Sequence, residues 1–188
     1  MPRQKCPTCN RPSKQCLCSW LKNIENSHKI IILRHKTEAR HSLNTANILQ
    51  HCLSNCTLID GENFAPTDHG ILIYPGENSI SLNESAPIAS EQVFILLDGT
   101  WRKTRKILHL NPWLLKLPQI KLPEFNSKYI LRKKAPEGFS TLEAAVSLLG
   151  NLENNYLKYT PLLEAMKQMM QFQIDKMGPE TYQNNYKL

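Results

Sequence analysis

The feature that most constrains this chain is a run of five apolar residues that ends abruptly at an acid. Residues 93–97 are followed directly by Asp98, Gly99 and Thr100, and then by a helix-forming stretch rich in Arg and Lys. A short, uninterrupted apolar run predicts a strand buried on both faces, as in a parallel sheet. Gly99 permits a sharp exit from this strand, and Thr100 is a suitable N-cap for the helix that follows.

Asp98 follows this strand at the edge where open α/β sheets place their ligands, which is the carboxyl end of the strands. With Trp101, Arg102 and Arg105 close behind it, the acid is a candidate site residue. The alternative is structural: Asp98 caps the helix and Trp101 fills the core. These residues alone leave both interpretations open.

Short apolar runs alternate with amphipathic stretches along most of the chain. The predicted strands cover residues 28–33, 56–59, 70–77, 93–97 and 128–132. The predicted helices cover residues 42–49, 101–108, 140–149 and 160–177, and a capping-box pattern opens the third of them. This order predicts an α/β fold with a mainly parallel sheet and flanking helices. Three prolines between residues 109 and 124 predict a surface connector there instead of a long element.

The length and charge of the chain limit its class. Its 188 residues suit one globular domain with a small appendage, which we place at residues 21–188 and 1–20. A net charge of +7 is typical of proteins that meet phosphate in nucleic acid or at a membrane surface. No apolar run approaches the roughly 18 residues of a membrane span, and residues 1–18 lack the apolar core of a signal peptide. We therefore expect a cytoplasmic protein with reduced cysteines and no membrane partner.

The appendage carries four cysteines within thirteen positions, Cys6, Cys9, Cys16 and Cys18. This spacing predicts a closed, tetrahedral zinc knuckle, and a basic tail with free thiols is the alternative. Because so short a segment has no core of its own, the metal would supply its folding energy. Cys52 and Cys56 stand apart and are predicted to be buried thiols.

Polar clusters follow several of the predicted strands. Residues 74–76, residues 98–100 and the loop 132–140 would frame one pocket if they gathered at a single sheet edge. The segment 34–41 suits either phosphate contacts or a solvated loop, and its basic side chains are Arg34, His35, Lys36, Arg40 and His41. The chain has no Walker, Gly-x-Gly-x-x-Gly or Gly-x-Ser-x-Gly motif. This argues against ordinary nucleoside-triphosphate, dinucleotide and serine-hydrolase functions.

Taken together, these motifs resemble the DTW domain family, the tRNA-uridine aminocarboxypropyltransferases. The resemblance is carried, in the family's order, by the four-cysteine knuckle, residues 35–40 with Thr45, residues 74–77, residues 98–101 with Arg105 and Lys106, and residues 129–136 leading to 140–145. It covers most of the chain, and only about the last thirty residues carry no motif. One departure is Lys36, where the family pattern has Pro; this alters a turn and need not alter the chemistry.

The resemblance implies a SPOUT-like fold whose C-terminal half forms a trefoil knot around S-adenosylmethionine. It implies transfer of the 3-amino-3-carboxypropyl group of this co-substrate to N3 of a uridine in tRNA, in the variable loop in bacterial members, with release of 5′-methylthioadenosine. It also implies structural zinc in the knuckle. The alternatives are a SPOUT-type RNA methyltransferase and a non-catalytic zinc-knuckle RNA-binding protein. We expect a monomer.

The resemblance also suggests which residues carry each role. The expected catalytic residues are Asp98, Thr100 and Trp101. The expected cofactor-binding residues are Leu72, Tyr74, Pro75, Leu97, Asp98, Gly99, Leu131, Ser140 and Thr141. The expected contacts to tRNA are His35, Arg40, Arg102, Arg105, Arg132, Lys133 and Lys134. Asp98 suits either the base that deprotonates N3 or a ligand of the cofactor's amino group, and the sequence leaves both roles open.

Overall fold

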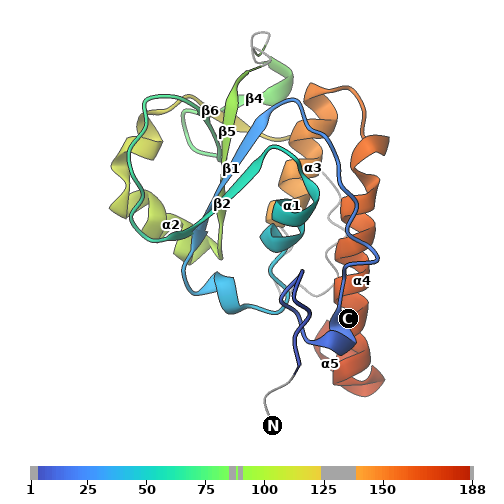
Figure 1. The fold of residues 1–188 in the computed structure, drawn as a ribbon. Coiled ribbons are helices and arrows are strands. Elements are labelled where there is room, and N and C mark those ends of the chain that lie inside the picture. Colours follow the sequence, from blue (N-terminus) through green and yellow to red (C-terminus); the bar gives the residue numbers. More distant parts are fainter. Residues whose placement is uncertain (1–3, 85–87, 89–90, 124–138, 187–188) are drawn as a thin grey trace.

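The computed structural model describes residues 4–84, 88, 91–123 and 139–186 (Figure 1). A six-stranded parallel sheet forms the centre of this part of the chain, in the order β2-β1-β5-β3-β6-β4. The strands are β1 (Lys29–His35), β2 (Cys56–Gly61), β3 (Ile71–Ile73), β4 (Ile80–Ser81), β5 (Val93–Asp98) and β6 (Gln119–Lys121). The predicted α/β class, with a parallel sheet and flanking helices, is confirmed.

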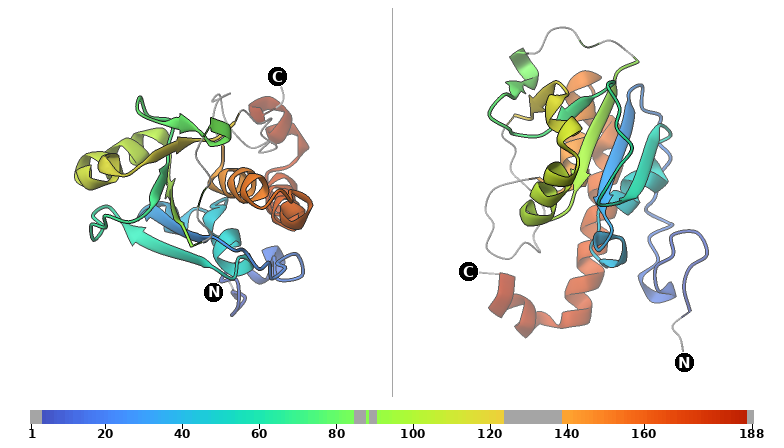
Figure 2. Two further views of the ribbon diagram at one scale, coloured as in Figure 1. Left: turned by 90° about the horizontal axis from the view of Figure 1, so that it is seen from above. Right: turned by 90° about the vertical axis from the view of Figure 1, so that its left-hand side faces the viewer.

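Helices cover both faces of the sheet. One face is covered by α1 (Ala46–Cys52), α3 (Thr141–Leu152) and α4 (Thr160–Met177), and the other by α2 (Trp101–Leu110) and the 3-10 turn η4 (Pro112–Lys116). The view from above in Figure 2 separates α2 from α3 and α4 across the strands. The last helix, α5 (Pro179–Tyr186), follows α4, and the remaining 3-10 turns are η1 (Ser13–Gln15), η2 (Glu38–Arg40), η3 (Leu82–Glu84) and η5 (Leu157–Tyr159). In the described ranges, none of the helices combines the length and the apolar character that crossing a bilayer requires.

The two central strands are buried on both faces, as the uninterrupted apolar runs predict. Successive side chains of a strand point to opposite faces, so Ile32 and Leu96 join the core under α1, α3 and α4, whereas Leu33 and Ile95 join the core under α2. All four side chains are at most 3% exposed. This alternation decides which strand-end residues share a face, and it therefore builds the site described below.

The proline-rich connector differs from its prediction as an irregular surface segment. It forms η4 and then β6, which pairs with β3 and β4 inside the sheet. The prolines allow this because they lie at element boundaries: Pro112 opens η4, Pro118 precedes β6 and Pro123 follows it. The predicted strand 128–132 lies outside the described residues, as does residue 131 with its expected cofactor contact.

A topological switch point lies between β1 and β5. The two strands are neighbours in the sheet, but the chain leaves β1 toward α1 on one face and leaves β5 toward α2 on the other. Connections that diverge in this way leave a crevice open at the carboxyl ends of the strands, where open α/β sheets bind ligands. Asp98 is the last residue of β5 and stands directly at this point.

Candidate functional site

A cavity of about 740 Å³ opens at the carboxyl ends of the central strands. Its walls are the ends of β3, β5 and β6, the first turns of α2 and α3, and the segment that precedes α1. Most of the residues predicted to hold a cofactor or to act in catalysis line it: Tyr74, Pro75, Leu97, Asp98, Gly99, Thr100, Trp101, Ser140 and Thr141. Leu72 instead lies in the core, where it is completely buried.

The carboxylate of Asp98 forms part of the cavity wall and is only 5% exposed. Its Oδ2 accepts a hydrogen bond of 2.6 Å from Nδ2 of Asn44, and its Oδ1 accepts one of 2.5 Å from the hydroxyl of Thr141. Burial raises the pKa of Asp98, and the two hydrogen bonds act against this rise by stabilising the anion. Asp98 is therefore a buried carboxylate, oriented by one donor on each oxygen.

Asn44 is a site residue that the sequence analysis did not identify. It lies just before α1, is 5% exposed, and lines the cavity beside Asp98. Its Oδ1 accepts a 3.0 Å hydrogen bond from Nη1 of Arg34, which leaves its amide nitrogen to donate to Asp98. The feature of the sequence that could have identified Asn44 is an Asn-Thr pair near the start of a predicted helix, but such a pair most often marks a helix cap.

The start of α3 forms the wall opposite the strands. The hydroxyl of Ser140 accepts from the backbone N–H of Glu143, whose side chain accepts in return from the backbone N–H of Ser140. The predicted capping box is thus confirmed, and it fixes the first turn so that Thr141 reaches Asp98. The first N–H groups of a helix have no partner within the helix, so this end favours an anionic ligand group.

Two aromatic side chains stand beside the cavity. Trp101 is 49% exposed and meets Tyr74 edge to face, with ring centroids 6.3 Å apart. Trp101 therefore does not fill the core, which was one of the two interpretations of the sequence. Thr100 caps α2 by accepting a 3.4 Å hydrogen bond from the backbone N–H of Lys103, as predicted. A half-exposed indole beside a cavity presents a flat surface on which an aromatic ligand can stack.

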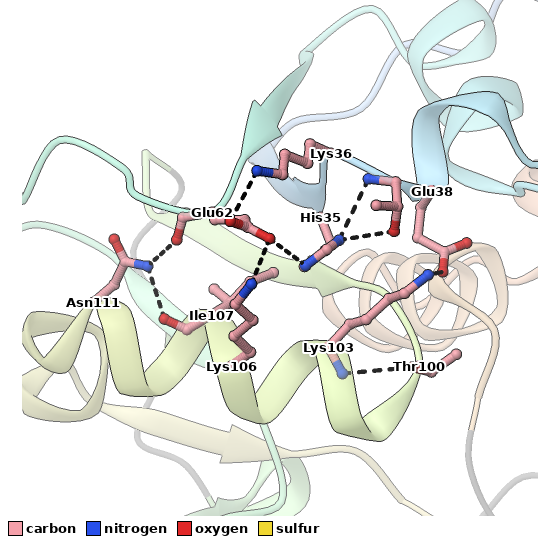
Figure 3. A network of polar contacts seen from close by, with 10 residues as sticks. His35, Lys36, Glu38, Glu62, Thr100, Lys103, Lys106, Ile107 and Asn111 are labelled. Carbon is pink, nitrogen blue, oxygen red and sulfur yellow. Dashed lines mark hydrogen bonds and ion pairs between the residues drawn. The ribbon is translucent and has the colours of Figure 1, made fainter.

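A second acidic side chain reaches the cavity from η2. Glu38 lines the cavity and accepts a 2.6 Å hydrogen bond from Nζ of Lys103, which joins η2 to α2 (Figure 3). Its negative charge contributes to the raised pKa of Asp98. Lys103 thus places a positive charge beside Glu38, whose own negative charge disfavours the Asp98 anion.

His35 is buried beside this network instead of facing solvent. Its imidazole is 6% exposed; Nδ1 accepts from the backbone N–H of Thr37, and Nε2 lies 2.9 Å from Glu62 (Figure 3). Glu62 also forms ion pairs with Lys106 and Lys36, and hydrogen bonds from these two lysines lower the pKa of its carboxyl to about 2. Both ring nitrogens are thus used within the protein, and this geometry gives no support to the expected contact between His35 and tRNA phosphate.

The other residues predicted to contact RNA divide into two groups. Arg40, Arg102 and Arg105 are exposed and come from η2 and from the first turns of α2, the two segments that border the cavity. Residues 132–134 lie outside the described residues. These three arginines are therefore exposed on segments next to the cavity, although none of them lines it.

The four N-terminal cysteines gather into one cluster. Their sulfur atoms all lie within 4.8 Å of one another, with 3.5 Å between Cys6 and Cys18 and 3.8 Å between Cys9 and Cys16. A tetrahedral site with zinc–sulfur bonds of about 2.3 Å separates its sulfurs by about 3.8 Å, so the cluster fits this metal. The backbone N–H groups of Cys9 and Thr8 lower the pKa of Cys6, whereas hydrogen bonds with Cys16 and Cys6 raise the pKa of Cys18, so one thiol of this pair favours the thiolate that a metal needs and the other retains its proton.

The cysteine cluster is attached to the rest of the fold at two places. Leu17 is 2% exposed and belongs to the main core, and Nη1 of Arg11 donates a 2.9 Å hydrogen bond to the backbone oxygen of Ser42. Ser42 lies two residues before Asn44, in the segment that lines the cavity. Cys52 is buried, as predicted, whereas Cys56 is only partly buried, and both are free thiols.

Comparison with known proteins gives a consistent result. The family model described as "DTW domain" matches residues 3–174. The chain is 32% identical to tRNA-uridine aminocarboxypropyltransferase 2 of Drosophila melanogaster, over 95% of this chain and 78% of the fly protein. It is 32% identical to the protein of the same name in Mus musculus, over 92% of this chain and 64% of the mouse protein. It is 26% identical to tRNA-uridine aminocarboxypropyltransferase A of Arabidopsis thaliana, over 94% and 83%. No solved structure gives a significant match.

The burial of Asp98 predicts that Asp98→Asn stabilises the fold at neutral pH. Because the pKa of Asp98 is higher in the folded than in the unfolded chain, folding stability decreases as the pH rises through the interval between these two values. Asparagine carries no charge, so the variant should have the larger free energy of unfolding at pH 7, and its advantage should shrink as the pH is lowered. Urea unfolding of both proteins across this range measures the difference.

Asp68→Asn is the matched control, because the side chain of Asp68 is 88% exposed and lies outside the cavity. It should show no comparable stabilisation. A lower stability of Asp98→Asn at pH 7, or a gain that is constant with pH, would contradict the prediction.

Proposed function

This chain belongs to the DTW domain family, and on that premise we propose that it transfers the 3-amino-3-carboxypropyl group of S-adenosylmethionine to N3 of a uridine in tRNA. The observation that carries the proposal is the cavity at the switch point, where the buried carboxylate of Asp98 faces the N-terminus of α3. A group donor with a charged amino-acid end and an aromatic end matches these walls. The transfer adds one carbon–nitrogen bond to the uracil ring.

The chemistry requires a deprotonated nucleophile and a precise approach. N3 of uridine loses its proton and attacks the γ-carbon of the aminocarboxypropyl chain, while the bond from that carbon to sulfur breaks. The electron pair of this bond passes to the positively charged sulfur, so 5′-methylthioadenosine leaves as a neutral thioether. Because the sulfonium is already an activated leaving group, the protein has to supply a proton acceptor and alignment of the two reactants.

We assign the role of proton acceptor to Asp98. A carboxylate has room for about four hydrogen bonds, and Asn44 and Thr141 occupy one position on each oxygen. Positions therefore remain for an N–H group that enters the cavity. Burial raises the pKa of Asp98, and a higher pKa makes the carboxylate a stronger base toward the N3 proton.

The walls suggest how the two substrates are held. The first turn of α3, at Ser140 and Thr141, suits the carboxylate of the amino-acid moiety, because free helix N–H groups and the helix dipole favour an anion there. The apolar side chains Ile73, Leu96, Ile120, Leu122 and Phe139 suit the adenine ring. Trp101 stands beside the cavity, where its exposed face can stack on the target base.

Exposed arginines on the segments that border the cavity support tRNA as the second substrate. Arg40 in η2 and Arg102 and Arg105 in α2 lie outside the cavity lining and would contact phosphates on either side of the target uridine. The proposal keeps residues 132–134 in the same role. For His35 we propose a structural role instead of a contact with tRNA, because its two ring nitrogens already contact Thr37 and Glu62.

Two finer features of the family also belong to the proposal. One is a SPOUT-like topology with a C-terminal trefoil knot, which agrees with the parallel sheet and with a site at its carboxyl edge. The other is a structural zinc ion held by the four N-terminal cysteines of the knuckle, residues 1–20, beside the catalytic part, residues 21–188. Such an ion would supply the folding energy that this short segment lacks. We further propose a monomer that works in the cytoplasm.

A single-turnover assay tests the proposed transfer. The protein is mixed with bulk tRNA from a strain that lacks the modification and with S-adenosylmethionine labelled in the methionine carboxyl or in the methyl group. We expect only the carboxyl label to enter tRNA. Asp98→Asn should lower the rate about 100- to 10,000-fold, which is the usual contribution of a general base. Asp68→Asn should leave it unchanged.

The same assay separates the alternatives. Entry of the methyl label alone would make the protein a methyltransferase, and entry of neither label with tRNA binding intact would make it an RNA-binding protein. Calorimetric titration with S-adenosylmethionine distinguishes the two roles of Asp98. Unchanged affinity of Asp98→Asn supports the base, whereas lost affinity would make Asp98 a ligand of the cofactor's amino group.

The zinc proposal predicts one metal ion per chain and a coupling between the knuckle and the cavity. Cys16→Ser/Cys18→Ser should lose the ion in elemental analysis and lower the midpoint of thermal unfolding. Because Arg11 ties the knuckle to Ser42 beside the cavity, the same variant should also bind S-adenosylmethionine more weakly. Cys56→Ser changes a thiol outside the cluster and should retain both the metal and the affinity. A metal-free wild type of equal stability would contradict the proposal.

A further inference from the structure

Three charged side chains form a row across three neighbouring strands at the carboxyl edge of the sheet. Arg34 in β1 is in register with Asp60 of β2 on one side and with Asp98 of β5 on the other. Residues in register on parallel strands point to the same face, so a cation lies between two carboxylates. Only the Asp60 carboxylate reaches solvent, at 44% exposed, whereas Asp98 and Arg34 are buried.

The guanidinium of Arg34 uses its donors in two directions. Its Nε and Nη2 donate to the two carboxylate oxygens of Asp60, at 2.5 and 2.9 Å. Its Nη1 donates to Oδ1 of Asn44 at 3.0 Å and to Oδ1 of Asn47 at 2.7 Å. The bidentate pair with Asp60 fixes the plane of the guanidinium, and this plane aims Nη1 at the two amides.

A guanidinium can only donate, and this decides the orientation of the Asn44 amide. The oxygen of Asn44 must face Arg34, and its NH₂ group is thereby directed at Asp98, 2.6 Å away. If the amide turned over, its oxygen would face the Asp98 carboxylate and its NH₂ would face the guanidinium, and both contacts would be repulsive.

We propose that Arg34 is a positioning residue, which holds Asn44 in the one orientation that donates to Asp98 and thereby keeps this carboxylate ready to accept a proton. The consequence for catalysis rests on the proposed function, whereas the orientation of Asn44 does not. Arg34 therefore acts through Asn44, and Asp60 acts through Arg34, as a chain that begins at the protein surface.

Other charged groups near Asp98 also change its pKa, so the test has to separate their effects from the effect of Asn44. Glu38 raises the pKa of Asp98 and is itself paired with Lys103, while the positive charge of Arg34 lowers that pKa directly. The other titratable side chains that line the cavity in the described residues are His41, Tyr74 and Lys121. A variant that removes the charge of Arg34 would mix its direct electrostatic effect with its effect on Asn44. The informative substitution therefore keeps the charge.

Arg34→Lys meets this requirement. A lysine keeps one positive charge, but its single ammonium cannot reproduce the planar fork that holds Asp60 and two amide oxygens together. The readout is the carboxyl titration of Asp98 by ¹³C NMR, which is favourable here because the chain has only four aspartates, Asp60, Asp68, Asp98 and Asp175. The resonance that disappears in Asp98→Asn identifies the residue.

We expect Arg34→Lys to move the titration midpoint of Asp98 upward when Asn44 is present. In the Asn44→Ala background the same substitution should cause a much smaller shift, because no amide remains to be oriented. Equal shifts in the two backgrounds would mean that Arg34 acts on Asp98 without Asn44, and this would overturn the proposal. The absence of a shift with Asn44 present would also overturn it.

Asp60→Asn provides a second route to the same test if Arg34→Lys does not fold. It weakens the anchor of Arg34 from the exposed end of the row and leaves the buried groups in place. We expect a shift in the same direction that depends on Asn44 in the same way. An equal shift without Asn44 would again overturn the proposal.

The titration needs neither S-adenosylmethionine nor tRNA, so its outcome is independent of the transfer assay. If transfer occurs, the acidic limb of the single-turnover pH profile should move with the midpoint, at a tenfold loss of rate per pH unit below the limb. A midpoint that moves while the limb stays fixed would remove Asp98 from the role of base and leave the orientation of Asn44 intact. Failure of the proposed function is therefore distinguishable from failure of this inference.

Discussion

A carboxylate that loses its water on folding stays ionised only if protein donors and positive charge take the place of that water. The site is built around this balance at Asp98, which is 5% exposed and accepts one hydrogen bond on each oxygen, while burial still raises its pKa. The two donors come from opposite sides, Asn44 from the segment before α1 and Thr141 from the first turn of α3. The cavity lies where these segments converge, so the same contacts that stabilise the anion also shape the cavity wall.

The geometry of a parallel sheet brings these groups together. Strands in register place Asp60, Arg34 and Asp98 side by side on one face, and the switch point between β1 and β5 opens the space above them. The opposite face of the same strand ends holds His35, which is paired with Glu62 beneath α2. Adjacent residues of β1 therefore serve different layers: Arg34 supports the acid in the cavity, and His35 ties β1 to the loop after β2.

The sequence predicted those parts of the fold that depend on local pattern. The apolar runs predicted the central strands, the capping box predicted the start of α3, and Asp98 at a strand end predicted the edge that holds the cavity. The sequence pattern did not predict the role of Asn44. This role comes from its contacts with Arg34 in β1 and Asp98 in β5, which only the folded structure brings beside it. Nor did the pattern predict β6, because three prolines within 16 residues suggest a loop unless one knows that they fall at element boundaries. Charge alone could not separate buried His35 from exposed Arg40.

If S-adenosylmethionine binds in the cavity beside Asp98, hydrogen–deuterium exchange should differ with and without this ligand in the segments that line the cavity. We predict slower exchange in three segments that are distant in sequence but meet at the cavity: residues 73–76, residues 97–100 and residues 140–144. Exchange should stay unchanged in residues 66–68 and 116–118, which line a separate hollow on the α2 side. Protection confined to that hollow, or no protection in any segment at saturating ligand, would rule out binding in the cavity beside Asp98.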